Sequence, residues 1–110
     1  MRTFLISAAM SLSLLSFSIH AETTHFEITI KDHKFIPDTL TVPVNQKIKL
    51  KIINNDASPE EFESHSLNRE KVIHGNSSAV IFIGPLQSGE YEFVGEFNEE
   101  TAKGKIIAVK

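Results

Sequence analysis

Two stretches of this sequence concentrate acidic side chains, and one of them also contains a histidine. Residues 56–70 include five acidic residues and one arginine, and residues 90–100 include five glutamates and no base. Carboxylate oxygens and an imidazole nitrogen together suit hard or borderline cations such as iron, Cu(II), Mn(II) or Zn(II). If the fold brings the two stretches together, they form a strongly negative end that attracts cations.

The composition excludes several other kinds of chemistry. The chain has no cysteine, which removes thiolate catalysis, disulfide exchange and every metal site that contains cysteine. Its formal net charge of −3 and its lack of a basic stripe argue against nucleic acid as a partner. The sequence shows no cofactor motif and no nucleophile–base pair, so we expect a binding protein rather than an enzyme, with ferroxidase-type activity as the alternative.

The N-terminus has the pattern of a secretory signal peptide. Arg2 precedes an apolar stretch over residues 4–19, and the small residue Ala21 follows. The alternative is a membrane anchor, but the stretch is diluted by serines and is short for a bilayer span of about 20 residues. The sequence therefore predicts a signal peptide over residues 1–21, a periplasmic protein, and one domain over residues 22–110.

The rest of the chain alternates apolar and polar residues with a period of two, which is typical of half-buried strands. Clusters of Gly, Pro, Asn and Asp separate the alternating or apolar runs. The runs cover residues 26–31, 39–42, 47–52, 78–83, 90–93 and 105–109. This spacing predicts an all-β sandwich of about seven strands.

Two segments do not show this alternation, and both overlap the acidic stretches. They are residues 57–68 and residues 95–103. Ser58 followed by Pro59 and two glutamates resembles a helix start, so we expect one short helical turn there. Binding residues are often carried by loops of this kind on a rigid scaffold.

The order of these motifs resembles the cupredoxin pattern along nearly the whole of residues 22–110. A finer resemblance is to EfeO-type cupredoxin-like proteins, which are found with high-affinity iron permeases. The first signature, Pro-Glu-Glu-Phe-Glu-Ser-His-x-Leu-Asn-Arg-Glu-Lys, stands at residues 59–71. The second, Gly-Glu-Phe-x-x-Glu-Thr-Ala-Lys-Gly, stands at residues 95–104. The resemblance implies a cupredoxin-like Greek-key β-sandwich.

The resemblance also allows a test for a blue-copper centre, which needs two imidazoles and a thiolate, usually with a weak axial thioether. Laid on the cupredoxin ligand loop, Gly95 stands at the thiolate position, Asn98 near the second imidazole and Ala102 near the axial ligand. None of the three can serve that centre. Only His65 resembles a cupredoxin copper ligand, so a blue-copper electron carrier is excluded.

The remaining donors define the expected metal site. We expect Glu63, His65 and Glu96 to be ligands, with Glu61 and Glu99 as supporting ligands. The resemblance implies iron, Fe(III) or Fe(II), as the bound ion and a membrane iron permease or its periplasmic partner proteins as the partner; Cu(II) is the alternative ion. The resemblance implies a histidine at the position of Asn98. An amide oxygen binds a metal more weakly than an imidazole does.

Other interpretations of the same residues stay open at this point. Glu60 and Glu100 fit solvated surface positions. His65 also fits a buried histidine bonded to the backbone. The alternative function is a metal-free periplasmic interaction module that docks a basic partner through its acidic end.

Overall fold

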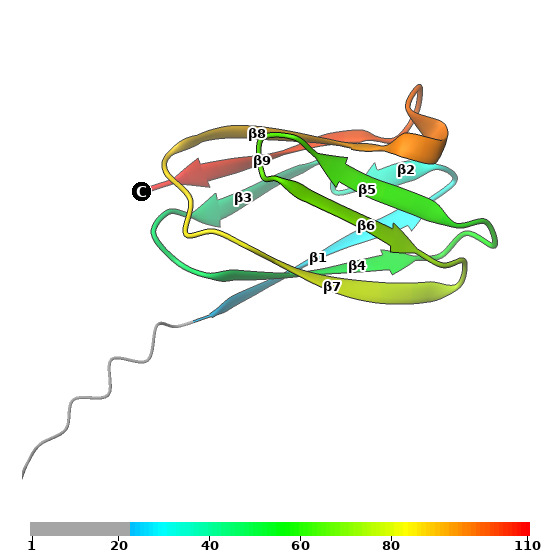
Figure 1. The fold of residues 1–110 in the computed structure, drawn as a ribbon, viewed down its shortest axis with the longest axis horizontal. Coiled ribbons are helices and arrows are strands. Elements are labelled where there is room, and N and C mark those ends of the chain that lie inside the picture. Colours follow the sequence, from blue (N-terminus) through cyan, green and yellow to red (C-terminus); the bar gives the residue numbers. More distant parts are fainter. Residues whose placement is uncertain (1–22) are drawn as a thin grey trace, which may run out of the picture.

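The structure, a computed structural model, describes residues 23–110, and the expected signal peptide over residues 1–21 lies outside them. The described residues form a β-sandwich with a single 3-10 turn, so the predicted all-β sandwich is confirmed (Figure 1). Within them, no helix is long and apolar enough to cross a membrane. The elements are β1 (Thr24–Lys31), β2 (Lys34–Ile36), β3 (Thr39–Pro43), β4 (Ile48–Asn54), β5 (Glu60–Ser64), β6 (Arg69–Ile73), β7 (Ser77–Ile83), β8 (Gly89–Gly95), η1 (Glu96–Asn98) and β9 (Lys103–Val109).

The strands form two sheets that face each other across the core. One sheet has the order β2-β1-β4-β7 and the other has the order β3-β9-β8-β5-β6. The pairs β1–β4 and β3–β9 are parallel, and the other pairs are antiparallel. The chain therefore crosses between the sheets several times, which brings β5 next to β8 although they are far apart in sequence (Figure 1).

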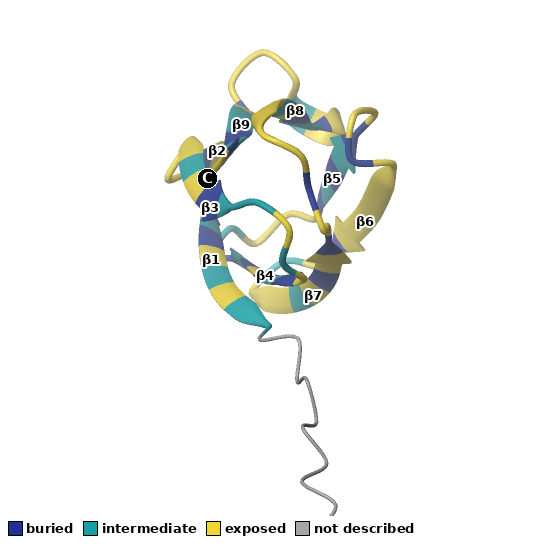
Figure 2. Cartoon of the chain, turned by 90° about the vertical axis from the view of Figure 1, so that its left-hand side faces the viewer, coloured by how far each residue is buried: buried dark blue, intermediate teal, exposed yellow. Residues whose placement is uncertain are grey.

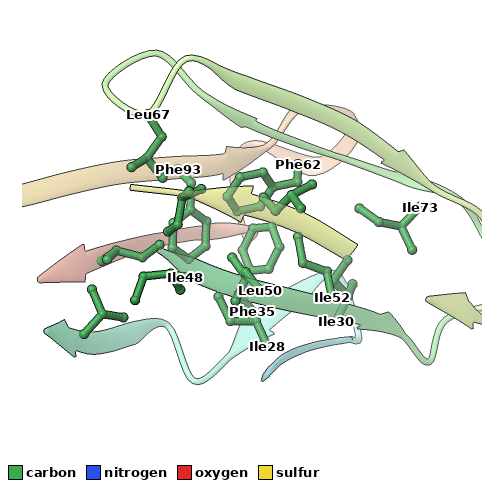
Figure 3. Packing of buried hydrophobic residues seen from close by; sticks show 14 of the residues in the cluster. Ile28, Ile30, Phe35, Ile48, Leu50, Ile52, Phe62, Leu67, Ile73 and Phe93 are labelled. Carbon is green, nitrogen blue, oxygen red and sulfur yellow. The ribbon is translucent and has the colours of Figure 1, made fainter. Parts of the chain in front are cut away.

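Three phenylalanines form the centre of the core. The ring centroids of Phe35 and Phe93 lie 4.9 Å apart, as do those of Phe62 and Phe93, while those of Phe35 and Phe62 lie 6.2 Å apart. Phe62 and Phe93 come from the five-stranded sheet, whereas Phe35 comes from β2 of the other sheet, whose strands β1 and β4 add Ile and Leu side chains to the same core (Figure 3). Phe62 thereby fixes β5 on the core, and the residues on either side of it face outward.

The first acidic stretch differs from its prediction. The helical turn expected from Ser58 onward is wrong, because Glu60 begins strand β5 and the only helical turn of residues 23–110 lies at Glu96–Asn98. Pairing of β5 with both β6 and β8 outweighs the local capping signal. The chain also has β2 and β6, which the alternation did not predict, and β6 is exposed along most of its length (Figure 2).

Candidate metal centre

The outer face of the five-stranded sheet brings glutamates of both acidic stretches together. In β5, residues 60, 62 and 64 face the core, so Glu61 and Glu63 face outward. Glu70 of β6 stands directly opposite Glu63. Glu63 also pairs with Val94 of β8, and the same register continued by two residues brings Glu96 level with Glu61.

Three of these carboxylates form a compact group. One oxygen each from Glu61, Glu70 and Glu96 lies within 4.8 Å of the other two. Oxygen ligands sit about 2.0–2.6 Å from a metal ion, so ligands of one ion lie within about 4–5 Å of each other. The group therefore has the dimensions of a cation site, and it faces solvent.

Hydrogen bonds between neighbouring carboxyl groups, followed by desolvation and repulsion between like charges, raise the pKa of two members of the group. A side-chain hydrogen bond with Glu70 is the largest cause that raises the pKa of Glu61 to about 7, followed by partial desolvation and repulsion from Glu96, Glu70 and Glu63. A hydrogen bond with Glu63 is the main cause that raises the pKa of Glu96. Close carboxylates share protons because they cannot all be ionised cheaply, and a cation removes this cost.

Glu63 and His65 lie at the border of the group. Glu63 is hydrogen-bonded to Glu96, and its Oε1 lies 3.6 Å from Nε2 of His65. The His65 side chain is 97% exposed, so the interpretation of His65 as a buried histidine is wrong. Beside the two residues runs an open groove of about 420 Å³, also lined by Glu90 and Glu92. Of the expected ligands Glu63, His65 and Glu96, only Glu96 belongs to the compact group, and Glu63 and His65 lie beside it.

The structure places Glu99 away from the compact group. Glu99 follows η1 and, together with Glu100, borders a separate depression that includes His33 and Phe97. Among residues 23–110, the compact group contains Glu61, Glu70 and Glu96 alone. Of the two expected supporting residues, therefore, Glu61 belongs to the group and Glu99 does not.

Sequence reasoning did not select Glu70. Beside Arg69 it resembles a local charge pair at the surface, but the Arg69 guanidinium instead donates to the backbone oxygens of Phe82 and Asn68. The missing signal was the pairing of β6 with β5, which places Glu70 opposite Glu63. With the register known, the repeated glutamates on the two strands point to one patch.

The expectation that Glu60 is solvated is wrong, whereas Glu100 is exposed as expected. Glu60 is 1% exposed and faces the interior, with its carboxylate directed at the 95–102 loop. Its Oε1 accepts hydrogen bonds from the backbone N–H groups of Phe97 and Glu61, and its Oε2 accepts one from Nδ2 of Asn98. Buried carboxylates are kept in proteins when donors satisfy them in this way.

Comparison with known proteins identifies the family. Residues 3–108 match the family described as "Cupredoxin-like domain". The chain belongs to the cupredoxin-like family. This cupredoxin-like protein is also 51% identical over 81 residues to an uncharacterized protein of Rickettsia prowazekii (strain Madrid E). That match covers 74% of this chain, and the chain spans only 65% of the length of that relative.

Solved structures agree with the family at the level of the fold. Auracyanin A, described as a "blue" copper protein of Chloroflexus aurantiacus, superposes with a TM-score of 0.69 at 15% identity, covering 80% of this chain and 100% of auracyanin A. The metal binding domain of the Streptococcus pneumoniae D39 Cu(I)-exporting ATPase CopA superposes with a TM-score of 0.66 at 14% identity, covering 83% and 99%. Identities this low show a shared fold, and the narrower EfeO-type membership stays a prediction.

The interior of this cupredoxin-like protein is not built for blue copper. The chain has no cysteine to supply the thiolate. Gly95, Asn98 and Ala102, which stand at the three ligand positions of the last loop, lie around the Glu60 carboxylate. Asn98 Nδ2 is 2.7 Å from Glu60 Oε2, and a Cβ built on Gly95 would lie 2.6 Å from both Glu60 Cδ and Ala102 Cβ.

Proposed function

We propose that this protein is an exported, periplasmic iron-binding member of the cupredoxin-like family that captures or delivers iron for a high-affinity iron permease. It acts as a binding protein rather than an enzyme. The observation that carries the proposal is the compact group of Glu61, Glu70 and Glu96 on the outer face of the five-stranded sheet.

The chemistry of the donor set supports a hard cation. The group offers carboxylate oxygens, with the Glu63 carboxylate and the His65 imidazole at its border. Soft Cu(I) prefers thiolate and thioether ligands, which the group lacks, whereas oxygen donors suit harder ions. Iron is the ion implied by the resemblance of residues 59–71 and 95–104 to EfeO-type proteins, and Cu(II) is the competitor.

Exposure of the group suits a protein that passes an ion on. Glu70 and Glu96 are exposed and Glu61 is half-buried, so a bound ion would stay accessible from solvent. A permanently held structural ion is normally enclosed by a full set of protein ligands. An open site on a rigid sheet is better suited to capture and transfer.

Calorimetry tests the proposal. Fe(II) is titrated anaerobically into residues 22–110, with Cu(II), Mn(II) and Zn(II) titrated in parallel. We expect about one Fe(II) per chain, and we expect the pair Glu61→Gln and Glu70→Gln to weaken binding by more than about 100-fold, since losing outer-shell partners alone costs 10–100-fold.

A control matched in the number of carboxyl groups separates a site from general acidity. The pair Glu27→Gln and Glu100→Gln also removes two carboxyl groups, but from exposed positions outside the group, and should leave iron affinity unchanged. Equal loss of affinity in both pairs would contradict the assigned site. No binding of any of the four ions by the unmodified chain would favour the alternative function, docking of a basic partner on the acidic face.

A further inference from the structure

The buried carboxylate of Glu60 belongs to no part of the proposed metal site, because it points to the opposite side of β5 from Glu61. It lies where β5 begins and η1 turns away from β8. Both oxygens are used: Oε1 lies 2.9 Å from the Phe97 nitrogen and 3.0 Å from the Glu61 nitrogen, and Oε2 lies 2.7 Å from Asn98 Nδ2. Hydrogen bonds to a carboxylate are stronger than those between neutral groups.

The 95–102 loop closes on itself around this carboxylate. The Gly95 N–H donates to the Ala102 carbonyl at 2.8 Å, and the Ala102 N–H donates to the Asn98 carbonyl at 2.8 Å. Gly95 leaves the space that the carboxylate fills, since a Cβ there would approach Glu60 Cδ to 2.6 Å. The side chain of Glu60 therefore ties the closed loop to β5, in addition to the pairing of Gly95 with Phe62.

We infer that Glu60 is a positioning residue that fastens η1 to the start of β5 and so holds Glu96 beside Glu61 and Glu70. Glu96 is the first residue of η1, and its two successors both donate to Glu60. The part of this inference that concerns metal affinity rests on the proposed function. The part that concerns the turn does not, because it can be measured without metal.

The same contacts explain why the interior does not compete for the ion. An ion entering between Gly95, Asn98 and Ala102 would have to displace donors that already satisfy Glu60. Donors that are displaced from a buried carboxylate lose their hydrogen bonds, and leaving buried polar groups unsatisfied costs considerable free energy. Glu60 thus closes the interior position and keeps the outer face as the place for the cation.

The test combines amide hydrogen exchange at Phe97 with iron titration in residues 22–110. Glu60→Ala removes the acceptor of the Phe97 N–H, so we expect protection of that amide to fall by about tenfold or more. Iron affinity should fall by about 10–100-fold, as for other groups that orient a ligand. Asn98→Ala, which removes one of the three bonds, is the milder variant if Glu60→Ala does not fold, and it should lower both quantities less.

A reciprocal exchange keeps the hydrogen bonds and moves the charge. In Glu60→Gln with Asn98→Asp, the glutamine oxygen still accepts from the two backbone N–H groups and its amide donates to the new carboxylate. We expect this pair to keep most of the Phe97 protection and iron affinity that Glu60→Ala loses. Ser64→Ala is the control: it deletes another buried polar group, which stands at the opposite end of β5 from Glu60 and donates to the Glu92 carbonyl.

Ser64→Ala should lower the free energy of unfolding without a selective effect on Phe97 exchange or iron affinity. Unchanged Phe97 protection in Glu60→Ala and Asn98→Ala would overturn the inference, as would unchanged iron affinity in variants whose Phe97 protection is lost. Absence of iron binding by the unmodified chain would overturn the proposed function instead, and Phe97 exchange would still decide whether Glu60 fastens the turn.

Discussion

Glu61 is the residue whose protonation reports most directly on the acidic group. Its pKa is raised from an ordinary 4.5 to about 7, first by the hydrogen bond with Glu70 and then by desolvation and by repulsion from Glu96, Glu70 and Glu63. Between these two pH values the folded state binds more protons than the unfolded state. Stability must then fall as pH rises through this window.

We therefore expect the free energy of unfolding of the metal-free protein to decrease from pH 4.5 to about pH 7, with Glu96 acting in the same direction. Urea denaturation at intervals across this range measures it. Glu61→Gln, which cannot ionise, should flatten the decrease, whereas Glu27→Gln on the other sheet should not. If the free energy of unfolding of the unmodified chain instead rises over the same pH range, the raised pKa of Glu61 is contradicted.

Only part of the site was predictable from single residues. Glu61, Glu63 and Glu96 were predicted because each lies in an acid-rich stretch, and the structure connects them. Glu70 was not, because its role depends on a pairing between strands that local sequence does not reveal. Glu60 was assigned to the surface because its burial depends on donors that η1 supplies from 37 and 38 positions away.

Strand β5 is the element that positions the site, and Phe62 anchors it. Phe62 is fully buried against Phe35 and Phe93, between the outward-facing Glu61 and Glu63. We expect Phe62→Ala to lower the free energy of unfolding by about 3–5 kcal/mol, the cost of removing a core aromatic side chain. Val72→Ala, at an exposed position on neighbouring β6, should change it by no more than about 0.5 kcal/mol.

Chemical denaturation of both variants measures this difference. Similar small losses in the two variants would mean that β5 is not fixed by its central side chain. The register that aligns Glu61 with Glu96 would then need another cause.

The strands that the sequence predicted have apolar residues at their inward-facing positions, whereas the strands that it did not predict have polar residues there or are exposed. Strands with apolar residues on their inward side, such as β4 with Ile48, Leu50 and Ile52, follow the expected alternation. In β5 the inward positions on either side of Phe62 are Glu60 and Ser64, so the apolar period is lost. Strand β6 is exposed and mostly polar, and it exists because β5 offers it an edge to pair with.

The two outer faces of the molecule differ in their balance of charge. The five-stranded sheet presents the glutamates of β5, β6 and β8, with Lys105 of β9 paired to Glu90, while Lys49 and Lys51 outnumber Glu27 on the other sheet. An acidic face concentrates cations near it and also attracts basic proteins, so charge alone does not separate the two candidate functions. The effect of metal binding on the stability of the folded domain does separate the two functions.

An ion held by Glu61, Glu70 and Glu96 must stabilise the whole domain, because β5, β6 and η1 meet only when the chain is folded. At free Fe(II) about 100 times its Kd, binding to the native state alone adds about 2.7 kcal/mol. For a domain of this size each 1 kcal/mol raises Tm by about 4–8 °C, so Tm should rise by roughly 11–22 °C. Thermal unfolding followed by circular dichroism across a series of iron concentrations measures the shift.

The rise should depend on iron concentration and should disappear in Glu61→Gln with Glu70→Gln, while Glu27→Gln with Glu100→Gln keeps it. A general ionic effect behaves differently, because magnesium at equal ionic strength would reproduce it and both double variants would share it. A Tm that does not change with Fe, Cu, Mn or Zn would contradict the proposal that the acidic face binds a metal ion. That face would then be left to a basic partner, whose binding would weaken steeply with added salt.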